Sequence, residues 1–147
     1  MTGDSFNDSF DSMEPKKILI VEDDAFLRQI YSDTLQPEGY IVDVAVDGQD
    51  GLGKIKQGGY DLVLLDILMP KINGFDVMEM LKHDPEYKNN NKCIIFLTNL
   101  DNENDIKRAL ALGNGYLIKS QLTPGDLVKE VKMYLEKMSV PQDAPTA

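Results

Sequence analysis

Five short apolar runs, rich in branched residues, alternate along this chain with longer amphipathic stretches. The runs are Ile18–Val21, Ile41–Val46, Leu62–Leu65, Ile94–Leu97 and Tyr116–Ile118. Each is too short for a helix, and four of the five are continuously apolar, as are strands of a parallel sheet covered on both faces. Strict alternation of strands and helices implies right-handed crossovers. The sequence therefore predicts an α/β fold with a doubly wound five-stranded parallel sheet and five helices.

The second run differs from the others because it alternates. Val42, Val44 and Val46 are separated by Asp43 and Ala45. Such a strand has one face that tolerates water, so we predict that it lies at an edge of the sheet.

Apolar residues recur at helical spacing in the stretches between the strands. Four sets are clear: Leu27, Ile30, Tyr31 and Leu35; Phe75, Met78 and Leu81; Ile106, Ala109 and Leu110; and Leu127, Val131, Tyr134 and Met138. The remaining helix, within Asp47–Lys56, contains three glycines, each of which costs about 1 kcal/mol relative to alanine. We therefore predict that this helix is short or mobile.

The two ends of the chain differ in composition from its centre. Residues 1–14 are rich in Asp, Ser and Asn and show no sustained period, and residues 139–147 contain two prolines and little to bury. We predict disordered tails at both ends and one folded domain over residues 15–138.

Charge and cysteine content exclude several classes of protein. The chain has 25 acidic and 15 basic residues, and its net charge of −10 repels phosphodiester backbones and anionic lipids. The single cysteine cannot form an internal disulfide, no apolar run is long enough to span a membrane, and the N-terminal residues lack the pattern of a secretion signal. We expect a cytoplasmic protein with no direct nucleic-acid partner and no membrane partner.

Polar residues follow the predicted strands at their carboxyl ends. They are Glu22, Asp23 and Asp24 after the first strand, Asp66 after the third, Thr98 after the fourth and Lys119 after the fifth. In a strand order of 2-1-3-4-5 the first and third strands are neighbours, so Asp23 and Asp66 face each other where the order reverses. Asp24 is expected to cap the following helix.

Carboxylates placed this closely need a positive partner. At about 4 Å, two such charges repel by about 1 to 4 kcal/mol, depending on the local dielectric. A ligand set made only of oxygens favours a hard cation, and an incomplete set suits Mg²⁺. With Lys119 and Thr98 available to neutralise phosphoryl oxygens, Asp66 is the expected nucleophile of a phosphoryl transfer.

Four segments carry a resemblance to a known family. They are ILIVEDD (Ile18–Asp24), LLDILMPKINGFD (Leu64–Asp76), IIFLTN (Ile94–Asn99) and GYLIKS (Gly115–Ser120). In this order they make residues 16–138 resemble the receiver domains of two-component response regulators, which have a flavodoxin-like fold. The resemblance implies a stand-alone signalling phosphoacceptor that catalyses its own Mg²⁺-dependent phosphotransfer and autodephosphorylation and is not a conventional enzyme.

The resemblance also implies roles for individual residues. Asp66 would accept phosphate from a sensor histidine kinase or a phosphotransfer protein, and Lys119 would contact that phosphate. Glu22, Asp23, Asp66 and the backbone carbonyl of Leu68 would hold Mg²⁺, and Thr98 and Tyr116 would form the switch pair. A downstream protein would bind the face formed by the fourth helix, the fifth strand and the fifth helix.

Two residues depart from the family pattern. Ser120 follows the lysine where the family usually has proline, and Asn99 follows the threonine where it usually has a small residue. Asn99 would either narrow access to the site or add a hydrogen bond.

Three other interpretations of these sequence features can be compared with a receiver domain. One is a phosphorylation-independent adaptor with the same fold, against which the full set of Asp23, Asp66, Thr98 and Lys119 argues. Another is a phosphatase of the haloacid dehalogenase type, which needs its nucleophilic aspartate on the first strand. Asp66 follows the third predicted strand instead, which argues against this class. A nucleotide-binding loop at the glycine cluster lacks the required GK[ST] ending, so we expect these glycines to pack on the sheet.

Overall fold

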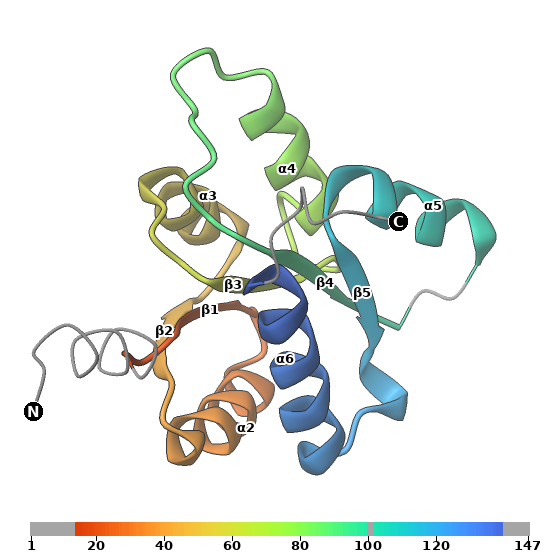
Figure 1. Ribbon diagram of the computed structural model, residues 1–147. Coiled ribbons are helices and arrows are strands. Elements are labelled where there is room, and N and C mark those ends of the chain that lie inside the picture. The colour runs from red at the N-terminus through yellow and green to blue at the C-terminus, as the bar shows by residue number, and fades with distance from the viewer. Residues whose placement is uncertain (1–13, 100–101, 140–147) are drawn as a thin grey trace, which may run out of the picture.

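Five parallel strands form one sheet in the order β2-β1-β3-β4-β5 (Figure 1), as the sequence predicts. They are β1 (Lys17–Val21), β2 (Ile41–Ala45), β3 (Leu62–Asp66), β4 (Ile94–Thr98) and β5 (Gly115–Ile118). This computed structural model describes residues 14–99 and 102–139. Apart from Glu14 and Ser139, the two predicted tails lie outside the described residues.

Each connection between successive strands contains a helix. The α-helices are α2 (Ala25–Leu35), α3 (Gly48–Gln57), α4 (Gly74–Lys82), α5 (Glu103–Leu112) and α6 (Pro124–Ser139), with short 3-10 turns at η1 (Gln36–Glu38) and η2 (Lys119–Gln121). Asp24 caps α2 by accepting the backbone N–H groups of Phe26 and Leu27, which confirms its predicted role. No helix within the described part of the chain is long and apolar enough to cross a bilayer.

The helices cover both faces of the sheet (Figure 1), because successive residues of a strand point to opposite sides. Along β1, Leu19 and Val21 pack into one core with residues of α3, α4 and α5. Ile18 and Ile20 pack into the other core, with residues of α2 and α6. The four strands that the sequence shows as continuously apolar thus contribute to two hydrophobic cores.

The helix over Gly48–Gln57 has ten residues, as many as α5, despite its three glycines. Its N-cap residue, Asp47, accepts the N–H of Asp50 at 2.8 Å. Gly48 and Gly51 are buried, and a Cβ atom added at Gly51 would lie 2.6 Å from Cγ1 of Val21. Close packing against the sheet therefore offsets the low helix propensity of glycine. The helix is not short, and the other alternative, that it is mobile, stays a prediction.

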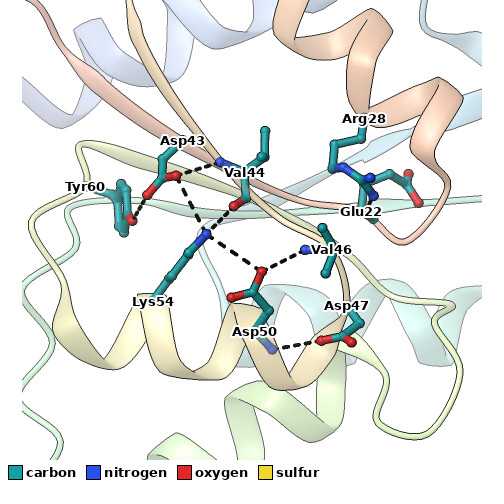
Figure 2. A network of polar contacts seen from close by, with 9 residues as sticks. All are labelled: Glu22, Arg28, Asp43, Val44, Val46, Asp47, Asp50, Lys54 and Tyr60. Atoms are coloured by element: carbon teal, nitrogen blue, oxygen red, sulfur yellow. Dashed lines mark hydrogen bonds and ion pairs between the residues drawn. The ribbon is translucent and has the colours of Figure 1, made fainter.

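The edge strand β2 is tied to the helix that follows it (Figure 2). Lys54 of α3 donates a hydrogen bond to the backbone carbonyl of Val44 and lies 3.7 Å from carboxylate oxygens of both Asp43 and Asp50. The hydroxyl of Tyr60 donates to Asp43 at 2.7 Å. A backbone group at the open edge is thereby paired, which reduces the tendency of an exposed strand to associate with other chains.

Candidate functional site

Three carboxylates meet at the carboxyl ends of β1 and β3. Glu22 and Asp23 directly follow β1, and Asp66 is the last residue of β3. These strands are neighbours, with Val21 paired to Leu65, so each of the three residues brings a carboxylate oxygen within 4.8 Å of the others. Glu22 and Asp66 are buried, with 1% and 2% of their surfaces exposed, whereas Asp23 is exposed. The predicted convergence of these residues is confirmed in geometry.

Lys119 reaches this cluster from the far side of β4. It lies in the η2 turn directly after β5, and its Nζ atom is 2.8 Å from Glu22 Oε1 and 3.3 Å from Asp66 Oδ1. The sequence predicts that Lys119 shares the rim with Asp66, but its closer contact with Glu22 was not predicted. One ammonium group among three carboxylates leaves a net negative charge.

The excess of negative charge affects the pKa values of the residues in this cluster. Burial, followed by the adjacent Glu22 carboxylate, raises the pKa of Asp66 to about 7, although Lys119 acts in the opposite direction. Burial and Glu22 also raise the pKa of Asp23. Burial by itself would lower the pKa of Lys119, but the two buried carboxylates outweigh it and raise that pKa. A proton or a cation is therefore favoured beside Asp66.

The donor set fits a hard divalent cation. Glu22 Oε1 is buried and receives no hydrogen bond of good geometry, since its contact with Lys119 is an ion pair only. Oxygen atoms alone converge here, without histidine or cysteine, and this is the set that Mg²⁺ prefers. A metal ion bound here would satisfy the buried carboxylate oxygen and balance the excess negative charge.

The backbone of the acidic loop is held by a residue that the sequence did not single out. Arg28, in the second turn of α2, donates from Nη1 to the carbonyl oxygens of Glu22 at 2.8 Å and Asp23 at 3.4 Å; Figure 2 shows the Arg28 and Glu22 side chains close together. A basic residue one helical turn after an acidic loop is the signal that could have identified it.

Thr98 and Tyr116 lie on neighbouring strands. Thr98 is buried at the end of β4, one residue beyond the Leu97 that pairs with Asp66. Tyr116 is half-buried on β5, opposite Phe96, and lines a groove of about 480 Å³ between β5 and α6. The structure thus brings Thr98 to the rim, whereas Tyr116 lies two residues before the end of its strand.

The loop after Asp66 carries Leu68, with 59% of its surface exposed. This loop is closely packed at Gly74, the first residue of α4, where an added Cβ atom would collide with the backbone carbonyl oxygen of Asp66. No local pattern identifies Gly74 in advance, because a close approach between two backbone segments is not visible in local composition.

The two departures noted in the sequence contact each other. The backbone N–H of Ser120 donates to Oδ1 of Asn99 at 2.8 Å. Of the two alternatives left open for Asn99, the added hydrogen bond is therefore present.

Comparisons with known proteins agree with this arrangement. The model of the response regulator receiver domain family matches residues 18–132. The chain is 38% identical over 109 residues to the chemotaxis protein CheY of Treponema pallidum, covering 71% of this chain and 73% of that protein. It is 36% identical over 105 residues to the transcriptional regulatory protein PcoR of Escherichia coli, covering 71% of this chain and 45% of PcoR.

Solved structures give the same result. The chemotaxis response regulator CheY4 of Vibrio cholerae superposes with a TM-score of 0.70 at 30% identity, covering 82% of this chain and 98% of that one. The chain spans half or less of the length of several relatives that it matches, PcoR among them. The match over residues 18–132, together with the shared fold, shows that this chain belongs to the response regulator receiver domain family.

Proposed function

We propose that Asp66 accepts a phosphoryl group from the phosphohistidine of a sensor histidine kinase or a phosphotransfer protein. The observation that carries the proposal is the position of Lys119, whose ammonium group lies 3.3 Å from Asp66 Oδ1 beside two further carboxylates. A carboxylate with a cation fixed at this distance is suited to attack phosphorus, because the oxygens of the transferring group meet positive charge there.

In the proposed transfer, one bond to phosphorus forms and another breaks. An oxygen of the Asp66 carboxylate forms a bond to phosphorus, the phosphorus–nitrogen bond of phosphohistidine breaks, and the imidazole leaves with the electron pair. Lys119 neutralises a phosphoryl oxygen, and the hydroxyl of Thr98, at the same rim, donates to another. Hydrolysis of the resulting acyl phosphate at the same site returns Asp66 to its starting state.

Mg²⁺ completes the proposed site. Glu22, Asp23 and Asp66 would hold the ion through their side chains, and Leu68 through its backbone carbonyl. When bound, the ion supplies positive charge to the phosphoryl oxygens and keeps Asp66 ionised.

The proposed output is a change in protein binding. Phosphorylation would draw Thr98 toward Asp66 and allow Tyr116 to repack, which alters the surface formed by α5, β5 and α6. The groove lined by Tyr116, Gln121 and Leu122 lies on this surface, and a downstream protein would bind there.

Intact mass spectrometry tests the chemistry. The purified chain is incubated with a small phosphodonor such as acetyl phosphate, with Mg²⁺ or with a chelator. We expect the mass of one phosphoryl group to be added only with Mg²⁺, to be lost in Asp66→Asn and to be retained in Asp33→Asn, an exposed control on α2. Phosphate uptake by Asp66→Asn, or uptake unaffected by the chelator, would contradict the proposal. Absence of uptake by the unsubstituted chain would favour a phosphorylation-independent adaptor.

A further inference from the structure

The loops that follow β4 and β5 are joined by a hydrogen bond from the Ser120 N–H to Asn99 Oδ1 at 2.8 Å. The last paired residues of these strands are Thr98 and Ile118. The bond therefore continues the connection between the two strands beyond the end of the ladder. It depends on a side-chain acceptor from one loop and a backbone donor from the other.

The two partners stand next to residues of the proposed phosphorylation site. Asn99 directly follows Thr98, and Ser120 directly follows Lys119. Ser120 also lies in the η2 turn, which is closed by a hydrogen bond of 3.2 Å from the N–H of Leu122 to the carbonyl of Lys119. Fixing the Ser120 amide therefore fixes the backbone from which the Lys119 side chain extends.

The position of that backbone matters because Lys119 reaches its partners across the end of β4. Its side chain is long and has several rotatable bonds. Its contacts with Glu22 and Asp66 therefore depend on the position of the backbone at residue 119. A displacement of about 1 Å in a group that orients a reacting phosphoryl group can lower a rate by up to about 100-fold.

We infer that Asn99 is a positioning residue that holds the η2 turn through the Ser120 amide and thereby keeps Lys119 at Asp66. This inference rests on the proposed phosphoryl transfer and adds to it a residue that does not touch the reacting atoms. Both Asn99 and Ser120 are exposed, so substitutions at either position leave the two hydrophobic cores intact.

The experiment measures phosphate uptake from acetyl phosphate with saturating Mg²⁺ in four variants of the full chain. Ser120→Ala keeps the backbone N–H, and Ser120→Pro removes it, so the two form a matched pair of backgrounds. Asn99→Ala, which removes the acceptor, is introduced into each background. The maximal rate, the phosphodonor KM, the Mg²⁺ affinity and the midpoint of thermal unfolding are recorded.

We expect Asn99→Ala to lower the maximal rate about 3- to 10-fold in the Ser120→Ala background. In the Ser120→Pro background the decrease should be less than about 2-fold, because position 120 then has no N–H to donate to Asn99. Mg²⁺ affinity and the unfolding midpoint should stay the same, because the substitution removes neither a metal ligand nor core packing. An equal decrease in both backgrounds, or none in either, would overturn the inference. Absence of uptake by the unsubstituted chain would instead overturn the proposed function, and the inference with it.

Discussion

At Asp66, burial and a neighbouring carboxylate favour a proton on the same oxygen atoms that would bind the proposed metal ion. The pKa of about 7 lies well above the usual value of 3.8. Near neutral pH, a metal ion that binds Asp66 must therefore displace a proton from part of the population. This competition gives the site a measurable dependence on pH.

We predict that Mg²⁺ affinity rises with pH by up to roughly tenfold per unit below pH 7 and levels off above it, because one proton is displaced from Asp66. Calorimetric titration at several pH values measures this. Asp66→Asn should bind Mg²⁺ more weakly and lose most of the slope. A flat profile for the unsubstituted chain would mean that Asp66 is ionised throughout.

The same shift affects stability in the absence of metal. Because the pKa of Asp66 is raised on folding, its contribution to stability is fully present below pH 3.8 and is lost as pH rises toward 7. Asp66→Asn should therefore increase the free energy of unfolding at pH 8 in a chelator, and the gain over the unsubstituted chain should shrink as the pH is lowered toward 5. Urea denaturation measures both values, and a destabilised Asp66→Asn at pH 8 would contradict the assignment.

Leu68 is expected to affect the lifetime of the proposed acyl phosphate. Its side chain is exposed two residues beyond Asp66 and can neither orient a water molecule by hydrogen bonding nor act as a base. We predict that Leu68→Asn speeds hydrolysis about 2- to 10-fold, or about 0.4 to 1.4 kcal/mol of barrier, whereas Leu68→Met does not. Loss of phosphate after donor removal is followed by mass; slower decay in Leu68→Asn would show that Leu68 does not shield the site. We also expect Leu100, two residues after Thr98 in the sequence, to border the path of the attacking water; it lies outside the described residues.

At the scale of single elements, two helical glycines differ sharply in their surroundings. A Cβ atom at Gly74 would overlap the backbone oxygen of Asp66, whereas a Cβ atom at Gly53 would meet nothing within 4 Å. The first glycine allows α4 to begin against the end of β3, and the second lies on the exposed side of α3.

These surroundings predict opposite effects of the same substitution. Gly74→Ala should lower the free energy of unfolding by about 1 to 3 kcal/mol, because either the loop or Asp66 must move. Gly53→Ala should raise it by about 0.5 to 1 kcal/mol through helix propensity. Chemical denaturation compares the two variants, and equal effects would show that the loop after β3 can adjust without cost.

At the scale of the whole molecule, the sheet order joins the acidic site to a distant surface. Asp66 ends the central strand β3, Thr98 ends its neighbour β4, and Lys119 follows the edge strand β5, which packs beside α6. We therefore expect a change in charge at Asp66 to affect the face formed by α5, β5 and α6 through the neighbouring strands.

We predict that beryllofluoride, a tetrahedral mimic of a phosphoryl group, changes amide hydrogen exchange in α5, β5 and the start of α6. Amide exchange in the edge strand β2 should stay the same, because β2 lies at the opposite edge of the sheet from β5. Asp66→Asn provides the control without a phosphoacceptor. A response confined to the loops beside Asp66 would contradict a switch on this face.

Much of this architecture could be predicted because it follows from patterns among residues that are close together in the sequence. Apolar runs indicated the five strands, and their carboxyl ends indicated Glu22, Asp23, Asp66 and Lys119. The rest depends on contacts between distant segments. Helix α3 is regular because Gly51 packs on Val21, and Asn99 accepts from an amide 21 residues away. Neither contact leaves a periodic signal in the sequence.

The proposed acyl phosphate on Asp66 is tested most directly by locating the modified residue. The chain is treated with acetyl phosphate and Mg²⁺, reduced with borohydride, which converts an aspartyl phosphate to homoserine, and digested for sequencing by mass spectrometry. We predict homoserine at position 66, dependent on both Mg²⁺ and the phosphodonor. Homoserine at another aspartate, or none at any position, would contradict the account.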